Sequence, residues 1–134
     1  MASRYDTNKK FRLLYAHDHK FFRHDGRVRT QSQFESTFWN RFLQHFDDIL
    51  VCARLGSLTK EPSPDKLPFA DRKALSFCLL PTLSSLRGQL LNRHSVRTEV
   101  EACVKSCDAV LARLPSEIGL LAISSALRLG KSWS

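Results

Sequence analysis

Residues 11–56 constrain the fold of this chain most, because two apolar runs flank a polar stretch and an amphipathic stretch there. The first run, Phe11–Ala16, stops at residues 17–20, whose polar side chains are costly to bury without partners. The second run, Ile49–Ala53, is continuously apolar, as in a parallel strand covered on both faces. We therefore predict a strand, a polar loop, a helix and a second strand, which together form a βαβ unit.

The segment between the two runs carries the signals of a helix. Ser32–Glu35 has the spacing of a capping box, in which side-chain oxygens accept hydrogen bonds from the free amides of the first turn. Apolar residues then recur three and four positions apart, until Asp47 and Asp48 end the pattern. This stripe consists of Phe34, Phe38, Trp39, Phe42, Leu43 and Phe46. A base-stacking platform is the alternative, but the helical spacing favours a face packed into the core.

The middle of the chain is divided by prolines. Residues 57–72 contain three of them together with several charges, which predicts a long exposed loop. Leu75–Leu80 then reads as a third strand, ended by Pro81. A helical pattern follows, uneven around Asn92–Ser95 and regular from there to Cys107.

The last third repeats the order of strand, polar loop and helix. Asp108–Ala112 predicts a fourth strand, and apolar residues at helical spacing follow from Ile118 to Leu129. Ser116 suits the N-cap of this helix and Gly130 suits its end. The final four residues would begin a fifth strand where the chain stops, so we expect the sequence to be cut short.

These patterns together predict an α/β fold. We expect residues 1–134 to form one Rossmann-like domain, a three-layer sandwich with a mostly parallel sheet of about four to five strands. Ligands of open parallel sheets bind at the carboxyl ends of the strands. The residues after Ala16, the turn at Arg54–Gly56 and the loop at Arg113–Ser116 are therefore expected to line the functional edge.

The charge and the cysteine content indicate which classes of partner and which cellular compartment suit this chain. The net charge of +8 favours an anionic partner, which is a nucleic acid, a phosphate-bearing substrate or an anionic membrane surface. No apolar run approaches the ~20 residues that span a bilayer, so we expect a cytoplasmic protein. Cys52 and Cys78 lie in apolar runs, and Cys103 and Cys107 share a helical face, which indicates reduced, buried thiols.

Four segments carry a resemblance to a known family. They read AHDHKF at 16–21, FWNRFL at 38–43, FDDILV at 46–51 followed by Arg54, and DAVLARLPSEIG at 108–119. They resemble the amino-terminal domain of bacterial retaining glycosyltransferases of the GT-B architecture (glycosyltransferase group 1, family 4-like), used in surface polysaccharide synthesis. The family often has a glycine pair before its first helix, where this chain has Thr30–Phe34.

The resemblance implies an acceptor-binding half of such a transferase. In this family the amino-terminal domain holds the acceptor, a glycan or a lipid-linked sugar, and the carboxyl-terminal domain holds the nucleotide-sugar donor. The family's paired glutamates belong to that second domain, so no catalytic residue is assigned here and the chain alone is expected to be inactive. The donor domain would come from a missing carboxyl-terminal part or a separate chain, and no cofactor of this half is expected.

Candidate site residues follow from strand-end positions and from the resemblance. His17 and Asp18 mix donors, acceptors and charge beyond a strand end, although a solvated loop is the plainer interpretation. Metal binding is a minor alternative because no second ligand cluster is apparent in the sequence, so no metal is expected. The cleft candidates are His17, Asp18, His19, Lys20, Arg54, Arg113 and Ser116, and the phosphate-contact candidates are Arg27, Arg29 and Ser32.

Two other functions remain open. Basic residues crowd the beginning of the chain, which favours a nucleic-acid-binding module, but no helix-turn-helix, zinc-finger or RNA-binding signature accompanies them. A non-catalytic interaction domain is the other alternative. The positive charge also suits a peripheral position on an anionic membrane, at its inner face.

Overall fold

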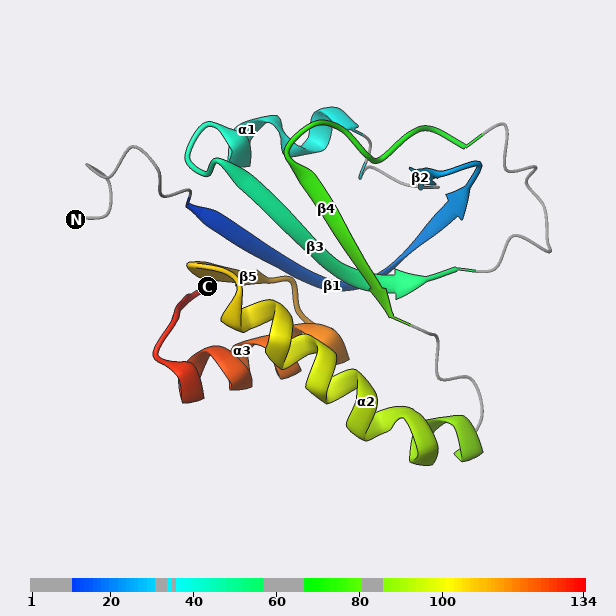
Figure 1. Cartoon of the computed structure of the whole chain (residues 1–134), viewed down its shortest axis with the longest axis vertical. Helices are drawn as coiled ribbons and strands as arrows, with labels where there is room; N and C mark the ends of the chain where they lie inside the picture. The colour runs from blue at the N-terminus through cyan, green and yellow to red at the C-terminus, as the bar shows by residue number, and fades with distance from the viewer. Residues whose placement is uncertain (1–10, 31–33, 35, 57–66, 81–85) are drawn as a thin grey trace.

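The chain folds into one sheet with helices on both of its faces (Figure 1). The structure is a computed structural model that describes residues 11–30, 34, 36–56, 67–80 and 86–134. In these residues the strands are β1 (Arg12–His24), β2 (Arg27–Arg29), β3 (Asp48–Leu55), β4 (Leu75–Leu80), β5 (Ala109–Ala112) and β6 (Ser132–Trp133). The helices are the 3₁₀ helix η2 (Ser36–Trp39), α1 (Asn40–Leu43), α2 (Leu86–Lys105) and α3 (Glu117–Leu129).

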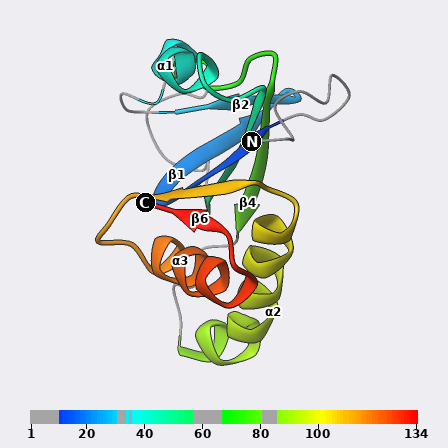
Figure 2. The same ribbon diagram turned by 90° about the vertical axis from the view of Figure 1, so that its left-hand side faces the viewer.

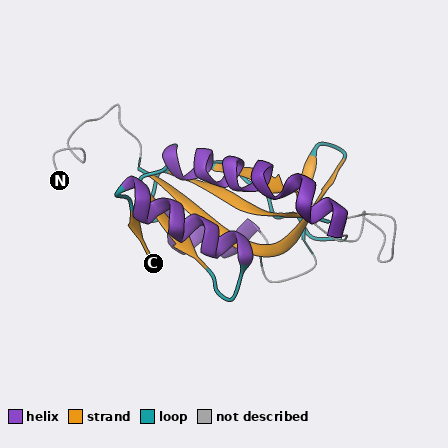
Figure 3. Cartoon of the chain, turned by 90° about the horizontal axis from the view of Figure 1, so that it is seen from below, coloured by secondary structure: helices purple, strands orange, loops and turns teal. Residues whose placement is uncertain are grey.

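The strands have a Rossmann-like arrangement, which confirms the predicted α/β fold class. Five strands are parallel in the order β4-β3-β1-β5-β6, and β2 pairs antiparallel with the far end of β1. The order reverses between β1 and β5, and this is the switch point where open sheets of this kind bind ligands. Figure 2 shows α1 on one face of the sheet and α2 and α3 together on the other, and Figure 3 shows the two long helices side by side across the strands.

Alternation along the strands divides the core into two halves. Successive side chains of a strand point to opposite faces, so Leu14 and Tyr15 of β1 enter different clusters. On the face of α2 and α3, Leu14 packs with Leu50 of β3 and Val100 of α2. On the face of α1, Tyr15 packs with the fully buried Trp39. Both clusters consist of apolar side chains, as a sheet covered on both faces requires.

β1 is longer than its apolar run predicted. The predicted end at Ala16 and the predicted loop at 17–20 are wrong, because the strand continues through them to His24. The pairing with β3 shifts between Ala16 and Lys20 and then resumes, so the polar stretch forms an irregularity inside the strand. A tight turn at Asp25 and Gly26, both with positive φ, then returns the chain as β2.

The helices also differ from their predicted extents. Within the aromatic stripe only residues 36–43 are helical, as η2 followed by α1, and four of its rings contact the ring of Tyr15. Of the predicted capping box, Ser32, Gln33 and Glu35 lie outside the described residues. In contrast, α2 runs unbroken from Leu86 to Lys105 through the stretch predicted to be uneven.

The described part of the proline-rich connection is attached to the domain. Leu67 and Ala70 are buried, so residues 67–72 are less exposed than predicted. The amide of Ala70 donates to the Val28 carbonyl at 2.8 Å, and the amide of Thr30 donates to the Pro68 carbonyl at 3.1 Å. These hydrogen bonds hold the connection against β2. None of the described helices is both long and apolar enough to cross a bilayer.

Candidate functional site

A hollow of about 480 Å³ lies at the switch point of the sheet, on the face of α1. Its floor is formed by Tyr15 of β1 and by the carboxyl-terminal end of β5, and its wall by η2 and α1. The lining residues are Tyr15, Thr37, Phe38, Arg41, Phe42, Leu111, Ala112 and Arg113. Its position is the one where parallel sheets of this order bind ligands, and its size suits a small molecule or one end of a larger one.

The inner wall of the hollow is aromatic. The ring of Tyr15 meets those of Phe38 and Phe42 edge to face, with centroids 5.9 and 5.8 Å apart. Trp39 packs against the same tyrosine from behind at 5.2 Å. Because edge-to-face packing fixes each ring against its neighbours, this wall is rigid and offers flat apolar surface to a ligand.

Two arginines supply positive charge at the rim of the hollow. The guanidinium of Arg41 lies 4.8 Å from the ring centroid of Phe42, and that of Arg113 lies 5.6 Å from the ring centroid of Phe34. Both side chains are exposed, and within the described part of the chain neither forms an ion pair. The hollow therefore combines aromatic surface with two cations available to an anionic group.

Two histidines extend the site along β1. His17 and His19 alternate with Tyr15 on the same face, and their rings stack at 6.3 Å. His19 Nε2 lies 3.0 Å from the Thr30 hydroxyl, and its ring lies 4.6 Å from that of Phe34. The Nδ1 atom of His17 is buried and has no hydrogen-bond partner among the residues that the structure describes.

Both imidazoles are held in the neutral form. Burial lowers the pKa of His19 to about 4, with further lowering by repulsion from His17, when that ring is protonated, and from Arg113. Burial and then Arg113 also lower the pKa of His17, and nearby Asp18 offsets only part of this effect. At neutral pH each ring therefore offers one donor and one acceptor rather than a charge.

This neutrality predicts an acid-sensitive fold. Below pH about 6.5 an unfolded chain protonates His19, whereas the folded chain resists protonation down to about pH 4, so the unfolded state binds more protons. Stability is therefore expected to fall as the pH decreases from 6.5 towards 4. Urea unfolding across this range should show a smaller loss in His19→Gln than in the native chain. His45→Gln, which alters an exposed histidine, should keep the native slope.

Asp18, Arg54 and Ser116, three predicted cleft residues, lie on the opposite face of the sheet. The Asp18 carboxylate accepts hydrogen bonds from the amides of Glu117 at 2.8 Å and Ile118 at 3.0 Å. The hydroxyl of Ser116 accepts from the Gly119 amide at 2.9 Å, which confirms the predicted N-cap. The amino-terminal end of α3, which suits a phosphate, is thus occupied by the chain's own carboxylate.

Arg54 completes this network. Its guanidinium is nearly buried and lies 3.7 Å from the Asp18 carboxylate and 3.3 Å from the Glu117 carboxylate. The network joins β1, β3 and the start of α3. These contacts give Asp18, Arg54 and Ser116 structural partners away from the hollow.

The remaining cleft and phosphate-contact candidates do not gather at the hollow. Arg27 makes a two-pronged contact with the Asp71 carboxylate, and Arg29 donates to the Leu67 carbonyl at 3.1 Å. Both guanidinium groups lie over the ring of Phe69, away from the residues that line the hollow. Lys20 is exposed near the end of β1, and Ser32 lies outside the described residues.

Most of the residues that line the hollow were not identified from the sequence. Of its lining residues only Arg113 was a predicted site residue, whereas Phe38 and Phe42 were assigned to the core and Arg41 was not singled out. The position of Arg41 within the aromatic stripe was a sequence signal that could have identified this wall as part of a binding site. In the structure Phe38 and Phe42 are only partly buried, so the stripe forms both core and site wall.

The fold and the hollow define an α/β protein with a Rossmann-like sheet and an aromatic, cationic site at its switch point. Comparisons with models of protein families, with curated proteins and with solved structures find no match for this chain.

Proposed function

We propose that this chain is the acceptor-binding half of a glycosyltransferase, and that the hollow holds a sugar phosphate of the acceptor. The observation that carries the proposal is the pairing of an aromatic wall with Arg41 and Arg113 at the switch point. A sugar ring presents flat apolar faces that pack on aromatic rings, and a phosphate accepts hydrogen bonds from guanidinium groups. The resemblance of the sequence to the amino-terminal domain of GT-B transferases supports the same proposal.

The remaining chemistry fits binding rather than catalysis. Neutral His17 and His19 offer donors and acceptors to sugar hydroxyls next to Arg113. The proposal therefore places the donor, a nucleotide sugar, in a second domain or a separate chain. It also places the protein in the cytoplasm, with its net charge of +8 favouring an anionic membrane surface that carries a lipid-linked acceptor.

The test is a titration of the full chain with N-acetylglucosamine 1-phosphate, in which binding is monitored by the intrinsic fluorescence of tryptophan. We expect Arg113→Gln and Arg41→Gln each to weaken binding about tenfold, since a hydrogen bond to a charged group contributes about 1.5 kcal/mol or more. Arg97→Gln is the matched control, because it removes the same charge from an exposed position on α2. Free N-acetylglucosamine should bind more weakly than its phosphate.

Two results would contradict the proposal. If all three arginine variants bind alike, the phosphate responds to overall charge and not to the hollow. If a random-sequence oligonucleotide binds tightly at physiological salt while the sugar phosphate does not, the nucleic-acid-binding alternative gains weight. The structure favours that alternative less, because Arg12, Arg27 and Arg54 are each engaged by a carboxylate of the chain.

A further inference from the structure

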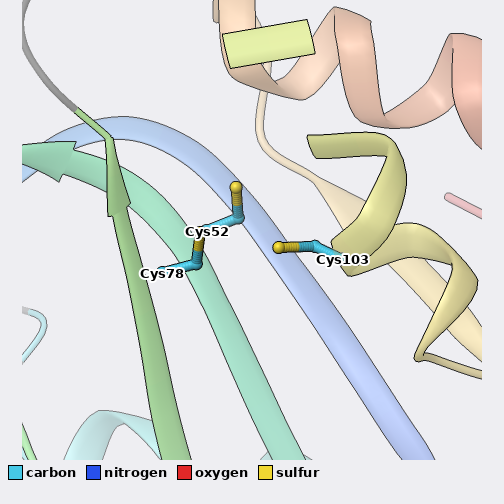
Figure 4. A group of neighbouring side chains, drawn as sticks. All are labelled: Cys52, Cys78 and Cys103. Atoms are coloured by element: carbon cyan, nitrogen blue, oxygen red, sulfur yellow. The ribbon is translucent and has the colours of Figure 1, made fainter. Parts of the chain in front are cut away.

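Three cysteines from distant parts of the sequence meet beneath the sheet. Cys52 of β3 and Cys78 of β4 are directly opposite each other in the parallel ladder, so their side chains share the face covered by α2. Cys103 projects from α2 towards them (Figure 4). The three sulfur atoms all lie within 4.8 Å of one another, and all three thiols are free.

We propose that Cys52, Cys78 and Cys103 form a binding site for a soft divalent metal ion, with Zn²⁺ as its natural ligand. Thiolates are preferred ligands of Zn²⁺, and sulfurs bound to one tetrahedral ion at about 2.3 Å lie about 3.8 Å apart. The observed separations reach that arrangement with small rotations of the side chains. Three protein ligands leave a fourth position for water or another ligand.

The surroundings of the cluster suit such a site. Cys52 and Cys103 are buried, whereas Cys78 lies on the edge strand β4 and is partly exposed, which gives an ion a path from solvent. The guanidinium of Arg23 donates to the carbonyl of Phe77 at 3.3 Å, which places a positive charge next to Cys78 on β4. Arg23 also offsets part of the negative charge that three thiolates around one divalent ion would carry.

Binding of the metal ion exchanges thiol protons for bonds from sulfur to the ion. Each thiol releases its proton to solvent as its sulfur bonds to the ion, so binding releases up to three protons and weakens as the pH falls. No oxidant or reductant takes part. The step does not depend on the hollow on the opposite face of the sheet, so this proposal stands apart from the sugar-phosphate proposal.

The experiment is a titration of the reduced, chelator-treated full chain with Cd²⁺, which forms an ultraviolet sulfur-to-metal charge-transfer band. We expect a band that saturates at one equivalent of Cd²⁺ and is displaced by competing Zn²⁺. Cys78→Ala and Cys103→Ala should each weaken binding by more than the about 10- to 100-fold that loss of an outer-shell partner costs. Cys107→Ala should bind Cd²⁺ as the native chain does. Cys107 is buried, as Cys103 is, and follows the end of α2, but it lies outside the cluster.

Circular dichroism without metal shows whether each variant is folded. Cys78→Ala alters the most exposed member of the cluster, so it carries the comparison if Cys103→Ala does not fold. Absence of the charge-transfer band in the native chain would overturn the proposal outright. Equal Cd²⁺ affinity in Cys78→Ala and Cys107→Ala would also overturn it, because binding would then not need the cluster.

Discussion

Trp39→Ala is expected to lower the free energy of unfolding by about 3–5 kcal/mol, as large-to-small changes at buried aromatic residues do. Trp39 is fully buried and is in ring contact with Tyr15 at 5.2 Å and Phe38 at 4.9 Å. Its removal leaves a cavity behind the wall of the hollow, so the wall loses both packing and rigidity. Urea unfolding measured by circular dichroism gives the change in stability.

Two further variants test the cause of this loss. Trp39→Phe should cost only about 1–2 kcal/mol, because a ring still fills most of the space. The indole nitrogen has no hydrogen-bond partner among the described residues, so phenylalanine removes no such bond there. Leu127→Ala, at a side chain that is 61% exposed, should change stability by less than about 0.5 kcal/mol. A Trp39→Ala loss no larger than that of Leu127→Ala would show that the aromatic cluster contributes little.

The strands of the sheet were the most predictable part of the fold. Continuous apolar runs such as Ile49–Ala53 predict buried parallel strands directly, and β3 is found there. The end of β1 was less predictable, because Asp18 and His19 have polar partners in other segments of the chain. Asp18 meets the amides at the start of α3, and His19 meets Thr30. Such partners make polar residues acceptable within a strand, and no local pattern reveals them.

The candidate sites depend still more on contacts between distant segments. Arg113 was predicted from its position after a strand, but its neighbour across the hollow, Arg41, is brought there only by the packing of α1 on Tyr15. The cysteine cluster has no ligand spacing in the sequence, since its members stand 25 or more positions apart. The pairing of β3 with β4 and the passage of α2 beneath them create it.

Asp18→Ala is expected to lower the free energy of unfolding by about 2–3 kcal/mol. The change removes the acceptor of two backbone amides at the start of α3 and one of the two carboxylates beside the nearly buried Arg54. The estimate lies below that for a fully buried pair because the Asp18 side chain is 35% exposed. Thermal and urea unfolding measure the loss, and hydrogen exchange should locate it at the first turn of α3.

The matched control separates this cap from overall charge. Glu99→Ala removes one negative charge from an exposed position on α2 and should leave stability within about 0.5 kcal/mol of the native value. Binding of N-acetylglucosamine 1-phosphate should persist in Asp18→Ala, because the network and the hollow lie on opposite faces of the sheet. If Asp18→Ala instead keeps its stability and loses that binding, Asp18 belongs to the ligand site and not to the support of α3.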